Sequence, residues 1–218
     1  MALDAVEVVG HELDRRHLAV AQQPGLVGGV QIVQLAHVHD DRRMVQSVEL
    51  VLDERLDVLV REEWELLVAA DLPSQGRHTG ASNAPHVTLG VADTIDPVAE
   101  RALARIDYGA GLAVRLGGLL VFGGRTSVLS RVVVPTAHLM ITHAAVASAL
   151  DEAPGRPSTM RPGAWTPHVT LARRLDPAQL AAALRVLAER PKELDGTIRC
   201  GRRWDGDARS TWDVPAGR

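Results

Sequence analysis

The sequence predicts a protein of mixed helices and strands that is built from two similar halves. Strand-like and helix-like segments alternate along most of the chain, and the pentapeptide Pro-His-Val-Thr-Leu occurs at residues 85–89 and again at 167–171. Both copies follow a proline-containing loop and precede a helix that opens with Asp-Pro, at Asp96 and at Asp176. A repeated order of elements is the mark of an internal duplication. We therefore expect two lobes that fold alike.

Apolar periodicity and capping residues define the elements of the first half. Asp53 is a good helix cap, and a proline directly after Asp96 suits the first turn of a second helix. Glycine pairs at 117–118 and 123–124 interrupt strand-like runs. The expected elements are a strand at 47–52, a helix from Asp53 to about 70, a loop at 73–85, a strand at 86–91, a helix from Asp96 to about 106, and strands at 112–116, 119–122 and 128–134.

The second half repeats this order less completely. Its helix at Asp176 has the same Asp-Pro opening as the helix at Asp96. The expected elements are a helix at 136–152, a loop at 153–167, a strand at 167–172, a helix from Asp176 to about 190, and closing strands at 194–199 and 210–214.

Residues 1–43 differ from the rest of the chain. They contain a glycine-rich break at 25–29 and a strand-like run at 31–35, without a sustained amphipathic pattern. We expect this segment to be a loosely attached or disordered extension, or the product of a start codon assigned too early. Residues 44–218 would then form the folded domain.

Composition excludes several classes of protein. A net charge of −3 argues against a protein whose main task is to coat nucleic acid. Cys200 is the single cysteine, so an intrachain disulfide cannot form, and neither a signal peptide nor a membrane-spanning run is recognisable. We expect a cytoplasmic protein that does not enter a membrane.

Each pentapeptide places a histidine and a threonine on one face of a strand. Alternate side chains of a strand share a face, so His86 lies beside Thr88 and His168 beside Thr170. The residues of each pair are about 7 Å apart along the backbone. One phosphate can contact an imidazole and a hydroxyl at that spacing.

Two facing pairs have the groups needed for acid–base chemistry on a phosphodiester without a metal. A neutral imidazole can deprotonate the attacking water while a protonated one gives a proton to the leaving oxygen. Threonine hydroxyls can donate to the non-bridging oxygens. A single such histidine is most often structural. A duplication kept for packing alone, however, would constrain the valine and leucine of the motif, which favours a functional role.

The two motifs resemble those of the 2H phosphoesterase superfamily. The run from His168 to Arg173, His-Val-Thr-Leu-Ala-Arg, is similar to the form found in the bacterial 2′-5′ RNA ligase and RNA 2′,3′-cyclic phosphodiesterase branch. The resemblance extends from about Met44 to the C-terminus. It implies a bilobal α+β fold with two antiparallel sheets, flanked by helices, around a central cleft that carries one motif per lobe.

The resemblance also implies a function and roles for residues. It implies activity on 2′,3′-cyclic phosphates or 2′-5′ linkages of RNA or nucleotides. His86 would be the acid, His168 the base, and Thr88 and Thr170 would bind phosphate. No metal or other cofactor is expected. The expected partner is an RNA terminus or nucleotide with a cyclic phosphate; no protein partner is inferred, and the chain is expected to be a monomer.

Three further residues are candidates for the cleft. Arg173 could bind phosphate through charge-assisted hydrogen bonds. Its odd offset from His168 would place it on the opposite face of a regular strand, so it reaches the cleft only if the strand ends or bulges first. Otherwise it would be a solvated or structural arginine beside Arg174. Phe122 could stack on a base or belong to the core. His78, in the loop before the first motif, could border the cleft or be merely solvated.

Two alternatives stand beside this hypothesis. The chain could be a binding module for RNA ends or nucleotides that lacks useful turnover. It could also be a 2H enzyme whose substrate is another small phosphodiester.

Overall fold

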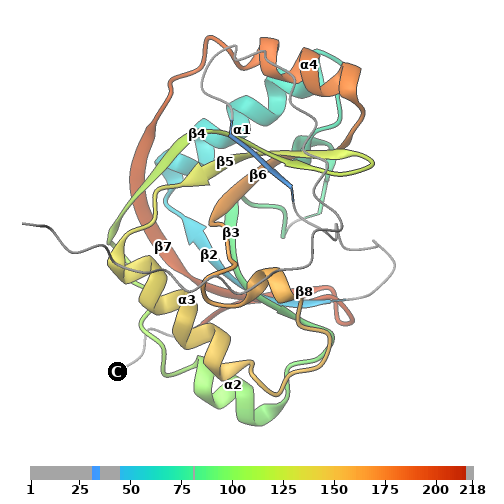
Figure 1. Ribbon diagram of the computed structural model, residues 1–218. Coiled ribbons are helices and arrows are strands. Elements are labelled where there is room, and N and C mark those ends of the chain that lie inside the picture. Colours follow the sequence, from blue (N-terminus) through green and yellow to red (C-terminus); the bar gives the residue numbers. More distant parts are fainter. Residues whose placement is uncertain (1–30, 35–44, 81, 215–218) are drawn as a thin grey trace, which may run out of the picture.

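The computed structural model describes residues 31–34, 45–80 and 82–214. It confirms the mixed helix-and-strand architecture (Figure 1). The strands are β1 Gln31–Gln34, β2 Gln46–Leu52, β3 His86–Ala92, β4 Ala113–Gly123, β5 Ser127–Val133, β6 His168–Leu175, β7 Leu194–Asp205 and β8 Ser210–Val214. The helices are α1 Glu54–Ala69, α2 Pro97–Leu103, α3 Ala137–Ala149 and α4 Pro177–Val186, with short 3₁₀ turns at Gln75–Arg77 and Ser158–Met160.

The helices begin at the predicted caps. The carboxylate of Asp53 accepts a hydrogen bond from the backbone N–H of Leu56 at 2.9 Å. Asp96 and Asp176 cap helices that have proline in the first turn, and Asp176 forms a capping box with Gln179. Helices α2 and α4 end a few residues earlier than the sequence pattern suggests.

The strands form one sheet, in the order β1-β4-β5-β6-β3-β2-β7-β8. Strand β1 pairs in parallel with β4, and the other pairings are antiparallel. A further pairing of β4 with β7 closes a circuit through β5, β6, β3 and β2. The expectation of two separate sheets is therefore wrong, because strands of the first half pair with strands of the second half: β2 and β4 with β7, and β3 and β5 with β6.

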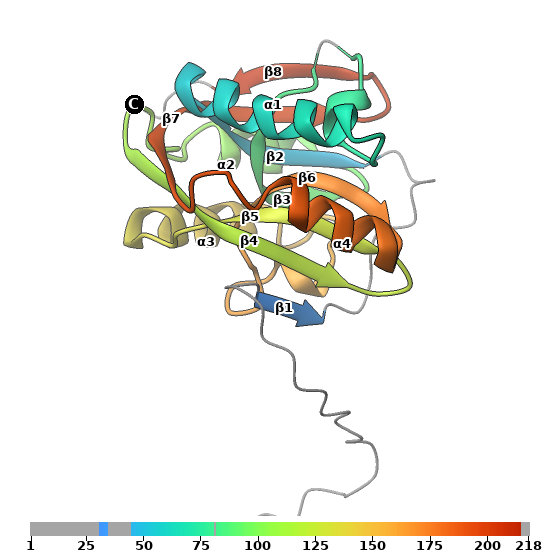
Figure 2. The same ribbon diagram turned by 90° about the horizontal axis from the view of Figure 1, so that it is seen from above.

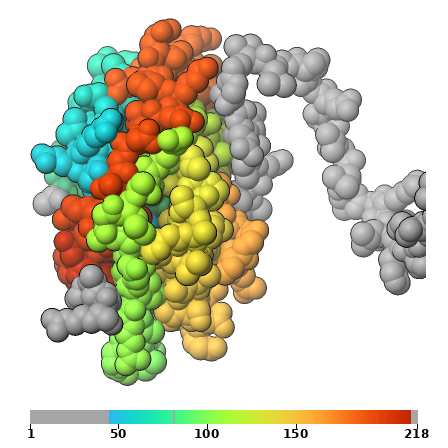
Figure 3. Space-filling model, turned by 90° about the vertical axis from the view of Figure 1, so that its left-hand side faces the viewer, coloured from blue at the N-terminus to red at the C-terminus, as the bar shows by residue number. Residues whose placement is uncertain are grey.

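The pairing of β4 with β7 and the pairing of β3 with β6 differ in extent. Strands β4 and β7 pair over four residues of each strand, from Ala113 to Leu116, whereas β3 and β6 meet only at Val87 and Val169. On the β4–β7 side the segments lie tightly against each other in the space-filling view (Figure 3). The single β3–β6 pair matters most for function, since it brings the two repeated motifs together.

The helices cover the sheet in two pairs. Helices α1 and α4 contact each other; α1 lies against β7, β6 and β2, and α4 against β5 and β6, while α2 packs on α3, which lies against β3 (Figures 1 and 2). The apolar face of each motif strand points into this core: Val87 and Val169 are each 1% exposed. Burial of these valines fixes the opposite face of both strands as the face that carries histidine and threonine.

Strands β4 and β1 differ from what the sequence pattern suggests. The strands expected at 112–116 and 119–122 are one strand, β4, because Gly117 and Gly118 shift the register with β5 instead of ending the strand. Strand β1 lies within residues 1–43, while the remaining part of that segment is outside the described residues. The division of the chain at Met44 stays a prediction.

Among the described helices, none has the length and apolar character to cross a membrane.

Candidate active site

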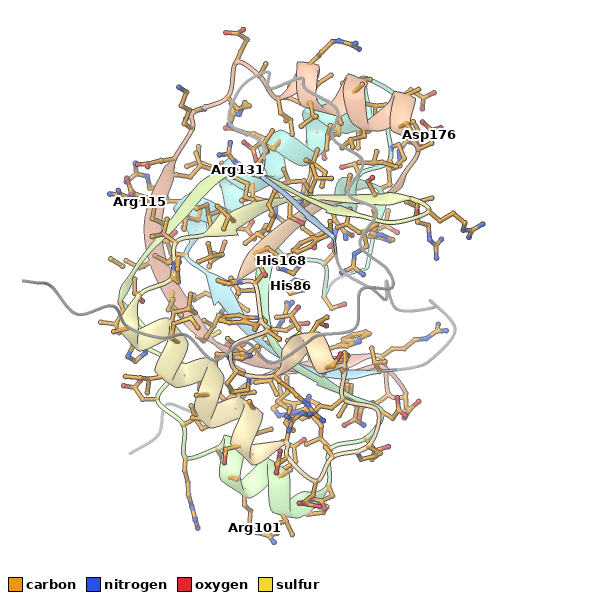
Figure 4. The ribbon with its side chains drawn as sticks, in the orientation of Figure 1. His86, Arg101, Arg115, Arg131, His168 and Asp176 are labelled. Carbon is orange, nitrogen blue, oxygen red and sulfur yellow. The ribbon has the colours of Figure 1, made fainter. Side chains whose placement is uncertain are left out.

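The four predicted motif residues flank the pair of valines where β3 meets β6. His86 and Thr88 lie on either side of Val87, and His168 and Thr170 on either side of Val169. Their side chains are half-buried, on the face opposite the core. His86 and His168 lie close together in the centre of the molecule, between the two pairs of helices (Figure 4). In an antiparallel pair with this register the two histidines are diagonal neighbours, about 7–8 Å apart.

Both imidazoles are held by the same hydrogen bond. Nδ1 of His86 lies 2.7 Å from the carbonyl oxygen of Ala84, and Nδ1 of His168 lies 2.8 Å from that of Thr166. A carbonyl oxygen can only accept, so Nδ1 carries the hydrogen in both rings. Nε2 is then the nitrogen that can take or give a proton in the site.

Two tryptophans fix the motif strands from behind. The indole N–H of Trp64, on α1, donates to the carbonyl oxygen of Thr170 at 3.1 Å, and that of Trp165 donates to the carbonyl oxygen of Thr88 at the same distance. These bonds reach the backbone just beyond the single β3–β6 pair. They orient the threonines where the ladder between β3 and β6 has already ended.

Glu49 is a site residue that the sequence interpretation missed. It lies on β2, is 5% exposed, and places Oε1 3.6 Å from Nε2 of His86. Ser47 donates to its Oε1 at 2.7 Å, and Arg202 donates to its Oε2 from Nε at 2.9 Å and from Nη2 at 2.7 Å. Burial raises the pKa of Glu49, but the charges of His86 and Arg202 and these hydrogen bonds outweigh it, so the pKa lies below its usual value.

His168 has a different environment. Its pKa is lowered to about 4, mainly by burial and in addition by the charges of Arg173 and His86, while the hydrogen bond with Thr166 opposes the shift. The edge of the Phe122 ring meets the imidazole with the centroids 4.6 Å apart. His168 is therefore neutral at physiological pH, with Nε2 ready to accept a proton.

Strand β6 contains the bulge on which the position of Arg173 depends. Leu129 pairs with Ala172 while its neighbour Ser130 pairs with Thr170, so Leu171 is an extra residue in β6. The extra residue moves Arg173 to the face of His168 and Thr170. Its charge acts on both His168 and Glu49, which places the guanidinium at the site.

The first motif strand has a bulge at the matching position. Val48 pairs with Gly90 and Glu49 with Thr88, which leaves Leu89 as the extra residue. Val91 therefore occupies the place in β3 that Arg173 occupies in β6. The two strands share their shape as well as their pentapeptide, but not the residue that follows the bulge.

The other two candidates fall in different places. Phe122 is 5% exposed and contacts His168, so it forms part of the wall behind the imidazole instead of offering a ring face to a base. His78 is exposed in the loop before β3, where its carbonyl oxygen accepts a hydrogen bond from Asn83. Within the described part of the chain, no three His, Cys, Asp or Glu side chains gather in a way that could hold a metal ion.

Comparison with known proteins gives a family match. Residues 61–200 match the family model described as the 2′-5′ RNA ligase superfamily. No curated protein sequence matches the chain.

Several solved structures are similar in fold. Usb1 of Kluyveromyces marxianus is 14% identical, with 79% of this chain and 98% of that chain covered and a TM-score of 0.46. TT0787 of Thermus thermophilus is 18% identical, with coverage of 73% and 86% and a TM-score of 0.48. A structure described as a phosphoesterase is 18% identical, with coverage of 78% and 93% and a TM-score of 0.45.

Proposed function

Because the chain belongs to the 2′-5′ RNA ligase superfamily, we propose that it is a metal-independent phosphoesterase acting on 2′,3′-cyclic phosphates or 2′-5′ linkages of RNA or nucleotides. The observation that carries this proposal is the meeting of the motifs at Val87 and Val169. That pairing sets two histidines, each held at Nδ1 by a backbone carbonyl oxygen, and two threonine hydroxyls on one face. The superfamily supplies the class of reaction, and the site supplies the residues for it.

The proposed reaction opens a 2′,3′-cyclic phosphate to a 2′-phosphate. His168, neutral because burial lowers its pKa to about 4, takes a proton from water at Nε2 as the water oxygen bonds to phosphorus. The bond from phosphorus to the 3′ oxygen breaks, and His86 gives its Nε2 proton to that oxygen. Thr88, Thr170 and Arg173 hold the non-bridging oxygens and stabilise their developing charge.

We also propose that the halves are duplicated lobes around a shared cleft. Each has an Asp-Pro helix start, a bulge after the motif threonine, and a carbonyl oxygen of that threonine that accepts a hydrogen bond from an indole N–H of the other half. Agreement in three unrelated details supports duplication more strongly than the pentapeptide alone. It also supports one composite site instead of two independent ones.

The test is hydrolysis of nucleoside 2′,3′-cyclic phosphates with a chelator present. His86→Ala and His168→Ala are each expected to reduce turnover by about 10²–10⁴-fold. His138→Ala, which removes a histidine from α3, is the control and keeps full activity. If either histidine variant hydrolysed the substrate at the wild-type rate, the paired-histidine mechanism would be contradicted.

The same assay separates the rival functions. Tight binding of nucleoside monophosphates by a wild-type protein without turnover would favour a binding module. Turnover of other small phosphodiesters in preference to nucleoside cyclic phosphates would favour a 2H enzyme of different specificity. The pH profile adds a further check, since kcat/KM reports the free enzyme and its acidic limb should lie near pH 4, at the pKa of His168.

A further inference from the structure

The two half-sites, each made of a motif strand and the strand that flanks it, differ at a second equivalent position besides that of Val91 and Arg173. Glu49 on β2 pairs with Thr88 of the first motif, and Ser130 on β5 pairs with Thr170 of the second. Each is thus the cross-strand neighbour of a motif threonine, on the strand that flanks the motif strand. One half-site has a buried carboxylate there, and the other has a hydroxyl.

The carboxylate is fixed where it can act on His86. Its Oε1 is 3.6 Å from Nε2 of His86, too far for a hydrogen bond but close enough for a strong charge interaction. Ser47 and Arg202 occupy its hydrogen-bonding positions, and Arg202 is itself anchored on the carbonyl oxygen of Ser82 at 3.1 Å. Glu49 therefore stays ionised without capturing the Nε2 hydrogen of the imidazolium, which remains free for a substrate.

The hydroxyl in the other half-site offers no such charge. Ser130 is fully buried, and its Oγ has no hydrogen-bond partner among the described residues. The charged groups near the two histidines include Glu49 on β2, Arg202 on β7 and Arg173 on β6. Glu49, the negatively charged residue, lies beside His86, whereas the positive charge of Arg173 acts on His168.

We infer that Glu49 is the positioning residue that makes His86 the general acid, and that Ser130 at the equivalent position leaves His168 to serve as the base. This inference rests on the proposed function for its catalytic consequence. The carboxylate favours the protonated His86 ring, whose Nε2 proton passes to the leaving oxygen as the phosphorus–oxygen bond breaks. The proton taken from water by His168 returns to solvent, and His86 is reprotonated beside Glu49.

The test compares Glu49→Gln with a matched control, Glu63→Gln. Glu63 is also a buried carboxylate paired with a buried arginine, Arg131, but it projects from α1 on the core side of the sheet. Both variants remove one buried charge and leave an arginine without its partner, so both lose stability. Only the change at Glu49 should alter acid catalysis.

The activity readout uses two leaving groups. With a nucleoside 2′,3′-cyclic phosphate, whose alkoxide must be protonated, Glu49→Gln should lower kcat by about 10–100-fold. With a nucleoside p-nitrophenyl phosphodiester, whose phenolate leaves without a proton, the loss should be below about threefold. Glu63→Gln should change neither. Equal losses on both substrates would overturn the inference.

A second readout does not depend on turnover. The imidazole nitrogen chemical shifts of His86 report whether the ring carries one proton or two, and Glu49→Gln, which removes the anion beside the ring, should reduce the doubly protonated fraction at a fixed pH. An unchanged fraction would refute the role of Glu49 even if the protein hydrolyses nothing. A wild-type protein without turnover but with the expected shift change would reject the proposed function and keep only the effect of Glu49 on the protonation of His86.

Should Glu49→Gln fail to fold, the double variant Glu49→Leu/Arg202→Met removes the carboxylate without an orphan charge. Replacement of a whole buried ion pair by apolar side chains is often neutral for stability. The double variant should show the same dependence on the leaving group and the same change in the His86 signals. A double variant that behaves as wild type in both measurements would refute the inference.

Discussion

Protonation of His168 should destabilise the protein in mildly acidic solution. In the folded protein its pKa is about 4, against an ordinary value of 6.5. The unfolded chain therefore binds more protons at this position between those two values. Stability from this group is complete above pH 6.5 and is lost as the pH falls toward 4.

The size of the effect follows from the two values. Each pKa unit corresponds to about 1.4 kcal/mol, so the whole difference is worth on the order of 3 kcal/mol. Between pH 7 and pH 5 the linkage relation gives a loss of about 2 kcal/mol from this group. In a domain of this size that loss lowers the melting temperature by about 4–8 °C.

The assay is urea denaturation at pH 7 and pH 5 for the wild type and for His168→Asn. Asparagine can keep the hydrogen bond to Thr166, but it does not titrate. Other acidic and histidine groups contribute equally to both proteins, so the difference between their pH dependences isolates position 168. If wild type and variant lose the same free energy of unfolding, His168 is not buried in its neutral form and the reasoning fails.

Three further predictions concern single contacts. Thr170→Val removes the hydroxyl proposed to bind phosphate and should lower kcat/KM for nucleoside cyclic phosphates by about 10²-fold with little change in melting temperature; an unchanged kcat/KM would remove Thr170 from the site. Trp165→Phe keeps a ring against His143 but leaves the carbonyl oxygen of Thr88 without its indole donor, a cost of about 1–3 kcal/mol that urea denaturation would detect. If Trp165→Phe does not lower the free energy of unfolding, water has replaced the indole as the donor to the carbonyl oxygen of Thr88. Glu63→Gln leaves Arg131 buried without a charged partner and should cost about 3–5 kcal/mol by the same method; a cost below about 1 kcal/mol would show that the pair is not dry.

The sequence predicted most elements of the fold because their signals are local. Asp53, Asp96 and Asp176 cap helices through contacts with residues two or three positions away, and alternation in the motif strands needs no partner. The closed circuit of strands could not be predicted in this way. It depends on the pairing of β4 with β7, which are far apart in the chain and carry no local mark of each other.

The candidate site was predictable where it repeats and hidden where it does not. His86 and His168 stood out because the pentapeptide occurs twice. Glu49 gave only a weak signal, a charged residue in the middle of an apolar run, and its partner Arg202 lies on β7, distant in sequence. Arg173 lies on the histidine face only because β6 has a bulge, and that bulge is visible in the pairing of β6 with β5. The register between two strands depends on tertiary structure, so the sequence alone does not reveal it.

The two motifs are identical in sequence, so they do not explain why one histidine would act as the acid and the other as the base. Acid and base catalysis need one protonated and one neutral imidazole, and two identical pentapeptides with identical Nδ1 hydrogen bonds cannot supply that difference. The asymmetry must come from residues outside the motifs. Glu49 faces His86 across from Thr88, and Arg173 follows the bulge beside His168, where the first strand has Val91. An anion near one ring favours its charged form and a cation near the other favours its neutral form. Burial is the main cause of the neutral form of His168, and the charge of Arg173 adds to it. Exchange of these two charges, with both motifs intact, should therefore lower the turnover of nucleoside cyclic phosphates.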